Sequence, residues 1–350
     1  MNVLDILVKN GYEYYYVGGF VRDYLLGNPS FDVDIATMCN IKSIDKLLNH
    51  KGKMYKDYMS YHINDEYYNY EITTFRKESN YKNNKPSRVY QAYDLYEDLL
   101  RRDFTINTFA MDNEGNIIDL LNAKKDLDKK LIKVVGNTYE RLTEDNTRIL
   151  RAIRFCVTLD FKLDNEIINF IKEKGSMLLS LKKEYIKSEL DKIFSSDNRM
   201  KFFDIVSKYK LNDYLHINYD KIVETDSYGL WAQIESDLPF NKDDKLIIKE
   251  IKKLINKNNI DIFDVYKYGE YVSNVAASIL HINIDDITNN IPIRSFMDID
   301  ISRKEILDIV GEENINKVFK RIEKDILLGK VDNDKKTIIK YIREVIKWKI

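Results

Sequence analysis

The chain has 350 residues, of which 44% are hydrophobic, so it can bury a sizeable core, and its length predicts two or three domains. Its 56 basic and 57 acidic residues nearly balance, so the chain is not a polycation and a nucleic-acid partner would have to meet a local basic surface. The four histidines lie far apart, which argues against a histidine-built metal site. Two cysteines argue against a disulfide framework and favour a reducing, cytoplasmic compartment.

No membrane attachment is predicted. The sequence has no run of eighteen apolar residues, which is about the length that a membrane-spanning helix needs. Asp5 and Lys9 interrupt the first residues, so the N-terminus does not have the pattern of a signal peptide.

The segment "YEYYYVGGFVRDYLLG" predicts a strand, a turn at Gly18 and Gly19, and a short helix closed by Gly27. Glycines at a strand-to-helix turn let an anion approach the backbone, and the first turn of the helix offers free N–H groups. The turn is therefore a candidate phosphate site.

Two aspartates lie in the next segment, "FDVDIAT". Because a strand points every second side chain to the same face, Asp32 and Asp34 share a face, where two carboxylates repel unless a cation lies between them. Solvated turn residues are the alternative, but Val33 and Ile35 indicate a buried strand. Paired carboxylates suit Mg²⁺, and two such ions activate an attacking hydroxyl and stabilise leaving pyrophosphate. Glu71, in "YNYEITTFR", is the candidate third carboxylate, unless it is an edge-strand surface charge.

Charges lead directly into an apolar segment in "EDLLRRDFTINTFAMD". Charged groups this close to a buried segment usually have partners. Asp103 and Asn107 are four residues apart, so on a helix they would share a face and could bind a ribose. The alternative is a solvated helix start.

A second charged cluster lies in "TEDNTRILRAIRF", where Thr143 is a candidate helix cap. Glu144, Arg148 and Arg151 follow a helical spacing on one face, and Asp145 reaches Arg148 at a spacing of three. The alternative is a salt-bridged surface helix. The apolar residues between these charges predict a buried helix, so we expect the charges to face a cleft.

An aspartate beside an arginine can read a nucleotide base. The carboxylate accepts from the exocyclic amine of C or A, and the guanidinium donates to the neighbouring ring nitrogen. U and G present a carbonyl and a ring N–H instead, which leaves polar groups unpaired at about 1–3 kcal/mol each. Asp145 and Arg148 would therefore admit C and A and reject U and G.

Four segments together resemble class II tRNA nucleotidyltransferases, the CCA-adding enzymes and their poly(A) polymerase relatives: "GGFVRDYLLGNPSFDVDIAT", "EITTFR", "EDLLRRDFTIN" and "EDNTRILRAIRF". The resemblance is strong over residues 12–160 and weaker beyond. It implies an α+β fold with a polymerase-beta-type head at 1–137. It implies an all-α neck at 138–200, body at 201–270 and tail at 271–350.

The resemblance also implies an activity and roles for single residues. The enzyme would add C, C and A to the 3′ end of tRNA from CTP and ATP, without a template, releasing pyrophosphate. Asp32 and Asp34 would bind Mg²⁺, and Asp145 and Arg148 would read the base. The resemblance implies nucleotide contacts at Gly19, Arg22, Arg102, Asp103, Arg151 and Arg154, and the residue patterns above add Gly18, Asn107 and Glu144. Residues 301–350 carry an excess of basic over acidic residues, which favours tRNA binding by the tail.

Some segments depart from the family pattern. Asn122 and Ala123 replace a glycine-rich turn, and the loop "KESNYKNNKPSRV" lacks the usual acidic and arginine-rich chemistry. In the family this loop is linked to the switch from C to A addition. CC-only or A-only addition and poly(A) synthesis therefore remain alternatives, beside a non-enzymatic RNA-binding helical protein. The sequence predicts no oligomeric state.

Overall fold

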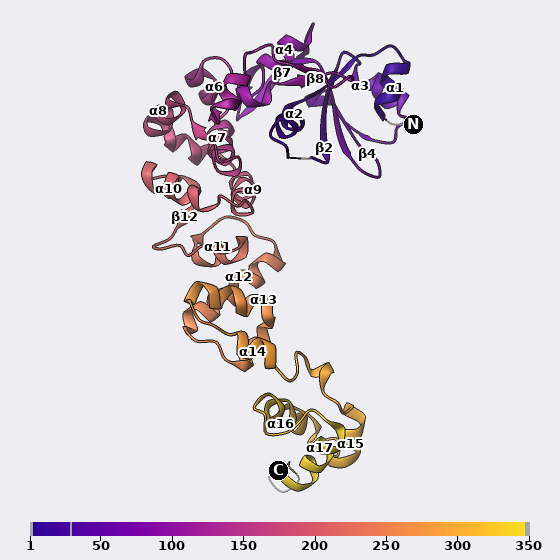
Figure 1. Ribbon diagram of the computed structural model, residues 1–350, viewed down its shortest axis with the longest axis vertical. Helices are drawn as coiled ribbons and strands as arrows, with labels where there is room; N and C mark the ends of the chain where they lie inside the picture. Colours follow the sequence, from indigo (N-terminus) through magenta and orange to yellow (C-terminus); the bar gives the residue numbers. More distant parts are fainter. Residues whose placement is uncertain (1–2, 29, 347–350) are drawn as a thin grey trace. The chain divides into compact units, whose positions relative to one another are not determined.

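The computed structural model describes residues 3–28 and 30–346, and the chain divides into two compact units, residues 1–216 and 217–350. The first unit contains a mixed sheet followed by helices, and the second is almost entirely helical (Figure 1). This confirms the predicted fold class, an α+β head followed by helical parts. The finer division into head, neck, body and tail stays a prediction. None of the described helices is long and apolar enough to cross a membrane.

The head is built on a seven-stranded sheet in the order β3-β4-β5-β2-β1-β8-β9. Strand β2 lies between β1, to which it is antiparallel, and β5, to which it is parallel. The strands are β1 (Tyr14–Val17), β2 (Asp32–Thr37), β3 (Lys53–Tyr55), β4 (Ser60–Asn64), β5 (Asn69–Thr74), β8 (Ala110–Met111) and β9 (Ile117–Ile118).

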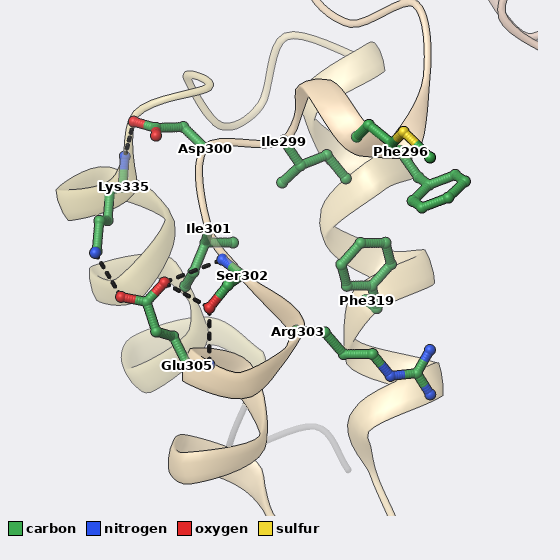
Figure 2. A pocket seen from close by; sticks show the side chains of 10 residues that line it. Phe296, Ile299, Asp300, Ile301, Ser302, Arg303, Glu305, Phe319 and Lys335 are labelled. Carbon is green, nitrogen blue, oxygen red and sulfur yellow. Dashed lines mark hydrogen bonds and ion pairs between the residues drawn. The ribbon is translucent and has the colours of Figure 1, made fainter.

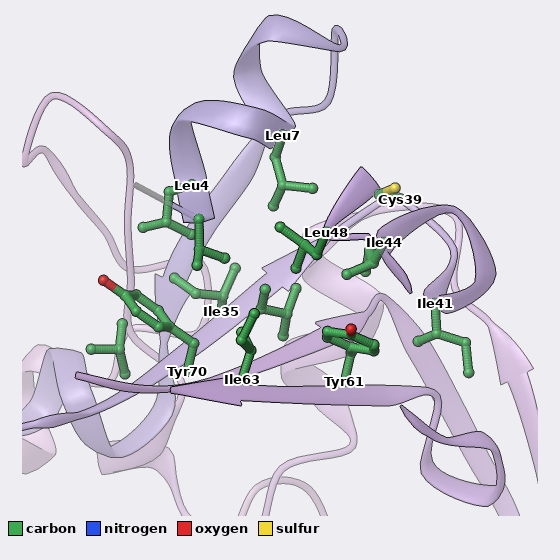
Figure 3. Packing of buried hydrophobic residues seen from close by; sticks show 13 residues of the cluster. Leu4, Leu7, Ile35, Cys39, Ile41, Ile44, Leu48, Tyr61, Ile63 and Tyr70 are labelled. Carbon is green, nitrogen blue, oxygen red and sulfur yellow. The ribbon is translucent and has the colours of Figure 1, made fainter. Parts of the chain in front are cut away.

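One face of this sheet packs into the hydrophobic core of the head. Val33, Ile35 and Ile72 belong to one buried cluster with residues of α1 (Val3–Lys9) and α3 (Ile41–Leu47). Figure 3 shows Ile35 of this cluster beside Leu4 and Ile44. Burying each such side chain contributes about 1.5–3 kcal/mol. Because side chains alternate along a strand, the residues between these apolar positions, Asp32 and Asp34 among them, must lie on the opposite face. The hydrophobic pattern therefore fixes the face on which the carboxylates lie.

The segment after "TTFR", which the sequence suggested was a loop, is a β-hairpin of β6 (Arg76–Lys82) and β7 (Lys85–Gln91). Asn83 and Asn84 at its tip have φ of 51° and 62°, the positive values that a two-residue type I′ turn requires. Asparagine tolerates this conformation better than most residues, so the pair favours the hairpin.

Helices complete the first unit. They are α2 (Gly18–Leu25), α4 (Leu95–Leu100), α5 (Lys124–Asp128), α6 (Thr138–Glu144), α7 (Thr147–Thr158), α8 (Asn165–Lys174), α9 (Lys183–Phe194) and α10 (Met200–Tyr209). A short parallel pair, β10 (Leu131–Ile132) and β11 (Lys162–Leu163), lies among them.

The prediction that Thr143 caps the helix of the second charged cluster is wrong, because Thr143 lies inside α6. The helix ends where Asp145 takes an extended backbone, and α7 begins at Thr147. Asn146 is the N-cap of α7 but makes no side-chain cap hydrogen bond. Asp145, one residue earlier, accepts from the backbone N–H of Thr147 at 3.0 Å and so satisfies one N–H of the first turn.

The second unit is a series of helices: α11 (Ser227–Gln233), α12 (Lys242–Lys257), α13 (Ile262–Leu280), α14 (Asp285–Asn290), α15 (Arg303–Val310), α16 (Ile315–Leu327) and α17 (Lys335–Tyr341), which continues into a π-helical turn (Ile342–Ile346). Strands β12 (Ile217–Asn218) and β13 (Glu235–Ser236) pair at its start. Its last part carries an open pocket of about 500 Å³. Phe296 and Phe319 line it opposite an ion pair of Lys335 with Glu305, as Figure 2 shows.

Candidate active site

The junction of β1 and α2 is built around a carboxylate. Gly18 has φ of +65°, and a Cβ there would lie 2.7 Å from Oδ2 of Asp34 and 2.9 Å from Nη1 of Arg102. The N–H of Gly19 donates to Oδ2 of Asp34 at 3.0 Å. Glycine is therefore needed at position 18 for both conformation and space. In this structure the N–H of Gly19 orients the carboxylate rather than remaining free for an anion.

The charge of Asp34 is incompletely compensated. Burial raises the pKa of its carboxyl, and the nearby Glu71 adds to this effect. The Arg102 guanidinium and the N–H groups of Gly19 and Phe20 oppose the rise without cancelling it. A buried carboxylate with a raised pKa and a second acid beside it is a site that a cation would stabilise.

Asp32 and Glu71 lie near Asp34 on the same face of the sheet. Asp32 lies two residues before Asp34 on β2. It is exposed and accepts from Nδ2 of Asn69 at 2.9 Å. Glu71 is the direct partner of Asp34 across the parallel pair of β2 and β5. Within residues 3–28 and 30–346, no three His, Cys, Asp or Glu side chains already converge as metal ligands. Their hard oxygen donors and the uncompensated Asp34 nevertheless fit a divalent cation.

A cavity of about 570 Å³ opens beside Asp34. Seven arginines and four acids line it, so its walls carry a net positive charge, as a polyanion such as a triphosphate requires. The lining residues are Gly18, Gly19, Arg22, Asp34, Arg76, Glu78, Arg101, Arg102, Asp103, Asn107, Asp145, Thr147, Arg148, Arg151, Arg154, Phe155 and Tyr185.

Arg102 is held by a buried acid that the sequence analysis did not identify. Asp98 has no exposed surface and accepts from Nη2 of Arg102 at 3.1 Å, from Nε of Arg101 at 3.0 Å and from the N–H of Arg76 at 3.1 Å. Burial would raise the pKa of Asp98, but the two guanidinium groups outweigh it and lower the pKa. The acid stays ionised and fixes Arg102 beside Asp34.

Asp103 and Asn107 come together as the sequence suggested, although no α-helix contains them: Asp103 lies in a bend and Asn107 ends a 3-10 turn (Thr105–Asn107). Oδ1 of Asp103 accepts from Nδ2 of Asn107 at 2.9 Å, and Oδ2 accepts from Nε of Arg151 at 2.8 Å. Oδ1 of Asn107 accepts from Nη1 of Arg22 at 2.6 Å. Burial would raise the pKa of Asp103, but Arg151 and the hydrogen bonds hold the pKa well below its usual range.

Asp145 and Arg148 both line the cavity but form a loose pair. Oδ2 of Asp145 lies 3.8 Å from Nε of Arg148. Arg148 is buried, and it donates to the carbonyl of Arg141 at 2.8 Å and to the hydroxyl of Tyr81 at 3.1 Å. Each terminal nitrogen of Arg148 keeps a further N–H, and Oδ2 of Asp145 faces a partner beyond normal hydrogen-bond reach. Both groups therefore have capacity left for a base edge.

Arg154 lies against an aromatic ring and a buried acid. Its Nε donates to Oε2 of Glu189 at 2.6 Å, and its guanidinium lies 4.0 Å from the ring centroid of Phe155. Arg22 and Arg151 also lie over this ring, at 5.0 and 5.4 Å. The ring separates three like charges and favours each of them electrostatically.

Glu144 does not line this cavity, although its Oε2 lies 3.7 Å from Nη1 of Arg148. It lines a neighbouring cavity of about 680 Å³ with the hairpin tip, and it pairs with Arg141 at 3.1 Å. Asp32 and Glu71 lie on the sheet face rather than in the cavity wall. Sequence reasoning did not identify six of the lining residues, which come from segments that no single short motif contains: Arg76, Glu78, Arg101, Thr147, Phe155 and Tyr185.

Known proteins are similar to this chain over nearly its whole length. The Poly A polymerase head domain family matches residues 14–133. The CCA-adding enzyme of Staphylococcus haemolyticus (strain JCSC1435) is 31% identical over 392 aligned positions, which cover 99% of this chain and 97% of that protein. The CCA-adding enzyme of Ligilactobacillus salivarius (strain UCC118) is 31% identical over 389 positions, covering 99% and 96%.

Solved structures share the fold. The Bacillus stearothermophilus CCA-adding enzyme in complex with CTP has a TM-score of 0.75 at 22% identity, covering 99% of this chain and 96% of that one. The Thermotoga maritima CCA-adding enzyme complexed with tRNA has a TM-score of 0.68 at 18% identity, covering 98% and 94%. With both curated relatives matched from end to end, the chain belongs to the CCA-adding enzyme family.

Proposed function

We propose that this chain adds C, C and A to the 3′ end of tRNA from CTP and ATP, without a nucleic-acid template, and releases pyrophosphate. The observation that carries the proposal is one cavity that joins Asp34, a group of arginines and the Asp145–Arg148 pair. Such a cavity would combine a catalytic carboxylate, a triphosphate site and a base reader. The curated relatives that match from end to end are named for the same activity.

We propose Mg²⁺ as the cation of this site, with Asp32 and Asp34 as ligands and Glu71 as the third carboxylate. The raised pKa of Asp34 supports this, because a divalent cation would relieve the repulsion that burial and Glu71 create. When bound, Mg²⁺ would supply activation of the attacking 3′-hydroxyl and charge stabilisation of the leaving pyrophosphate. The N–H of Gly19 holds Asp34 in place for this role.

The chain's own residues would bind and select the nucleotide. Arg22, Arg102, Arg151 and Arg154 would hold the triphosphate, which every NTP shares. Asp145 and Arg148 would read the base edge, so they alone distinguish C and A from U and G. The network around Asp103 and Asn107 would position the ribose.

The activity is tested by supplying tRNA that lacks CCA, tRNA that lacks only the final A, and complete tRNA, each with each of the four NTPs. We expect CTP to extend the first substrate by two residues, ATP to extend the second by one, and no NTP to extend the third. Incorporation of C without A would establish CC-only addition instead. Incorporation of A alone, or long A tracts, would establish the A-adding or poly(A) alternatives.

Base selection is tested separately with Asp145→Ala and Arg148→Ala. Each change removes a hydrogen-bonding partner worth about 1–3 kcal/mol for the correct base, which is about 5- to 150-fold in kcat/KM. The preference for CTP and ATP over UTP and GTP should shrink accordingly. An equal fall for all four NTPs would mean that the pair serves catalysis or folding and not base reading.

Two further properties belong to this proposal. The tail would contribute to tRNA binding through its basic excess. A cytoplasmic location is supported by Cys39 and Cys156, which both carry free, buried thiols.

A further inference from the structure

A row of side chains crosses four strands and begins at the catalytic carboxylate. Asp34 on β2 is the register partner of Glu71 on β5, Glu71 is the partner of His62 on β4, and His62 is the partner of Lys53 on β3. Register partners point to the same face of a sheet. The row therefore lies on the face opposite the hydrophobic core and leads from the active site to the edge of the sheet.

This part of the sheet carries an ordered group of polar and aromatic side chains. The Nζ of Lys53 lies 5.1 Å from the ring centroid of Tyr55, and the rings of Tyr55 and His62 lie 4.5 Å apart. His62 is 41% exposed and Glu71 is 47% exposed, so the face is accessible. We call Lys53, Tyr55 and His62 the sheet-face cluster.

The edge beside the sheet-face cluster is basic. Lys51, Lys53 and Lys56 are all exposed and lie within six residues at and around β3. Cations along a face that also carries aromatic rings are the combination that single-stranded nucleic acid binds. Here the lysines would meet phosphates, and the partly exposed ring of Tyr55 would stack on a base.

We propose that the sheet-face cluster binds the last nucleotides at the 3′ end of the RNA that is being extended. This inference rests on the proposed function and names the part of the site that takes the second substrate. The argument for this occupant is continuity with the active site. The cavity that would hold the incoming nucleotide is walled by α2 and α7, so it occupies one side of Asp34. The 3′-hydroxyl must reach the same carboxylates, and β5, β4 and β3 form an accessible polar approach on the other side.

The dimensions suit this occupant. Adjacent strands are about 4.8 Å apart, so three steps from β2 to β3 span about 14 Å. At about 3.4 Å per stacked base, that is room for roughly four nucleotides. The end of an acceptor strand can therefore lie between Lys53 and Asp34 without leaving the sheet.

The first test separates RNA binding from nucleotide binding. Tyr55→Leu removes the ring but keeps an apolar side chain, and it should raise the KM for tRNA lacking CCA by about 5- to 100-fold, the range for loss of one base-stacking ring. The KM for CTP should not change. Tyr55→Phe keeps the ring and should therefore keep the wild-type KM for tRNA.

Lys53→Ala should reduce the slope of log affinity for tRNA against log salt by about 0.7, the contribution of one single-strand phosphate contact. Lys46→Ala is the matched control, because Lys46 is an exposed lysine on α3, which packs on the opposite face. It should leave the slope unchanged. An unaltered KM for tRNA in Tyr55→Leu, or a slope reduced equally by both lysine changes, would overturn the assignment.

The second test uses the wild-type protein and so does not depend on a variant that folds. A tRNA lacking CCA, with 4-thiouridine as its last nucleotide, is irradiated in the complex and the cross-linked peptide is identified. We expect a cross-link within residues 51–64, and cross-links confined to other segments would refute the proposal. Addition of C and A by the wild type in the same preparation tests the proposed function itself, so the two failures are distinguishable.

Discussion

Replacing Gly18 by alanine should damage the active site far more than the fold. Gly18 has φ of +65°, and a Cβ at this position would lie 2.7 Å from Oδ2 of Asp34. Gly27 has φ of +77°, but a Cβ there would meet no atom within 4 Å. The two glycines share a backbone conformation and differ in what a methyl group would touch, so Gly27→Ala is the matched control.

The magnitudes follow from these contacts. Forcing alanine into the left-handed region costs about 1–2 kcal/mol, and both variants should lose this much stability. Gly18→Ala must in addition displace the Asp34 carboxylate, which accepts from the N–H of Gly19 at 3.0 Å. A hydrogen bond to a charged group is worth about 1.5–3 kcal/mol, so a displaced carboxylate should lower kcat by about 10- to 150-fold.

The assay has two readouts. Urea unfolding gives the free energy of unfolding, and incorporation of CTP into tRNA lacking CCA gives kcat. We expect similar stability losses in Gly18→Ala and Gly27→Ala, and a fall in kcat only in Gly18→Ala. If Gly18→Ala keeps the wild-type kcat, then the close contact with Asp34 has no part in catalysis and the reasoning is wrong.

Three other outcomes are expected. Asp34→Asn should abolish nucleotide addition, while the free energy of unfolding at pH 7 should stay equal or rise. The reason is that the pKa of Asp34 is raised in the fold, so its ionised form destabilises the fold as the pH rises above the unfolded pKa. A large loss of stability would contradict this. Asp103→Ala should cost about 3 kcal/mol at pH 7, the lower end for a broken buried pair because Arg151 is 34% exposed. Since the pKa of Asp103 is lowered, that cost should persist above pH about 4 and shrink as pH falls further, which urea titrations at several pH values would check. Tyr81→Phe should weaken discrimination between CTP and UTP with little change in melting temperature, because its hydroxyl contacts Arg148; unchanged selectivity would show that this hydrogen bond does not position the guanidinium.

The parts of the site that lie within one short motif could be predicted from the sequence. The spacing of Asp32 and Asp34 places both carboxylates on one face of β2, because a strand has a period of two. Asp103 and Asn107 meet although no helix contains both: Asp103 lies in a bend just before the 3-10 turn that ends at Asn107. Local spacing thus predicted proximity even where it predicted the wrong element.

The parts that depend on long-range packing could not be predicted. Asp98 looks like an ordinary acid near the start of a helix, yet it is fully buried because two guanidinium groups and a backbone N–H converge on it. Tyr185 enters the cavity from α9, a helix that the motifs do not include. The hairpin tip carried a usable signal, since two consecutive asparagines favour the positive φ of a tight turn.

The arrangement of the arginines bears on how one cavity can accept two different bases in succession. Arg102, Arg151 and Arg154 each donate to a carboxylate at 3.1, 2.8 and 2.6 Å, so their positions are fixed before a nucleotide arrives. Fixed cations suit the triphosphate, which CTP and ATP share, because little side-chain freedom is lost on binding.

The pair that we propose reads the base is built differently. Oδ2 of Asp145 and Nε of Arg148 are 3.8 Å apart, too far for a hydrogen bond. C and A place their amine and ring nitrogen at different distances from the ribose. Side chains that bind both bases must therefore shift by the difference in base size. A loosely joined pair can make that shift at less cost than a tight one. We infer that the tight pairs fix the triphosphate and that the loose pair allows the change from CTP to ATP.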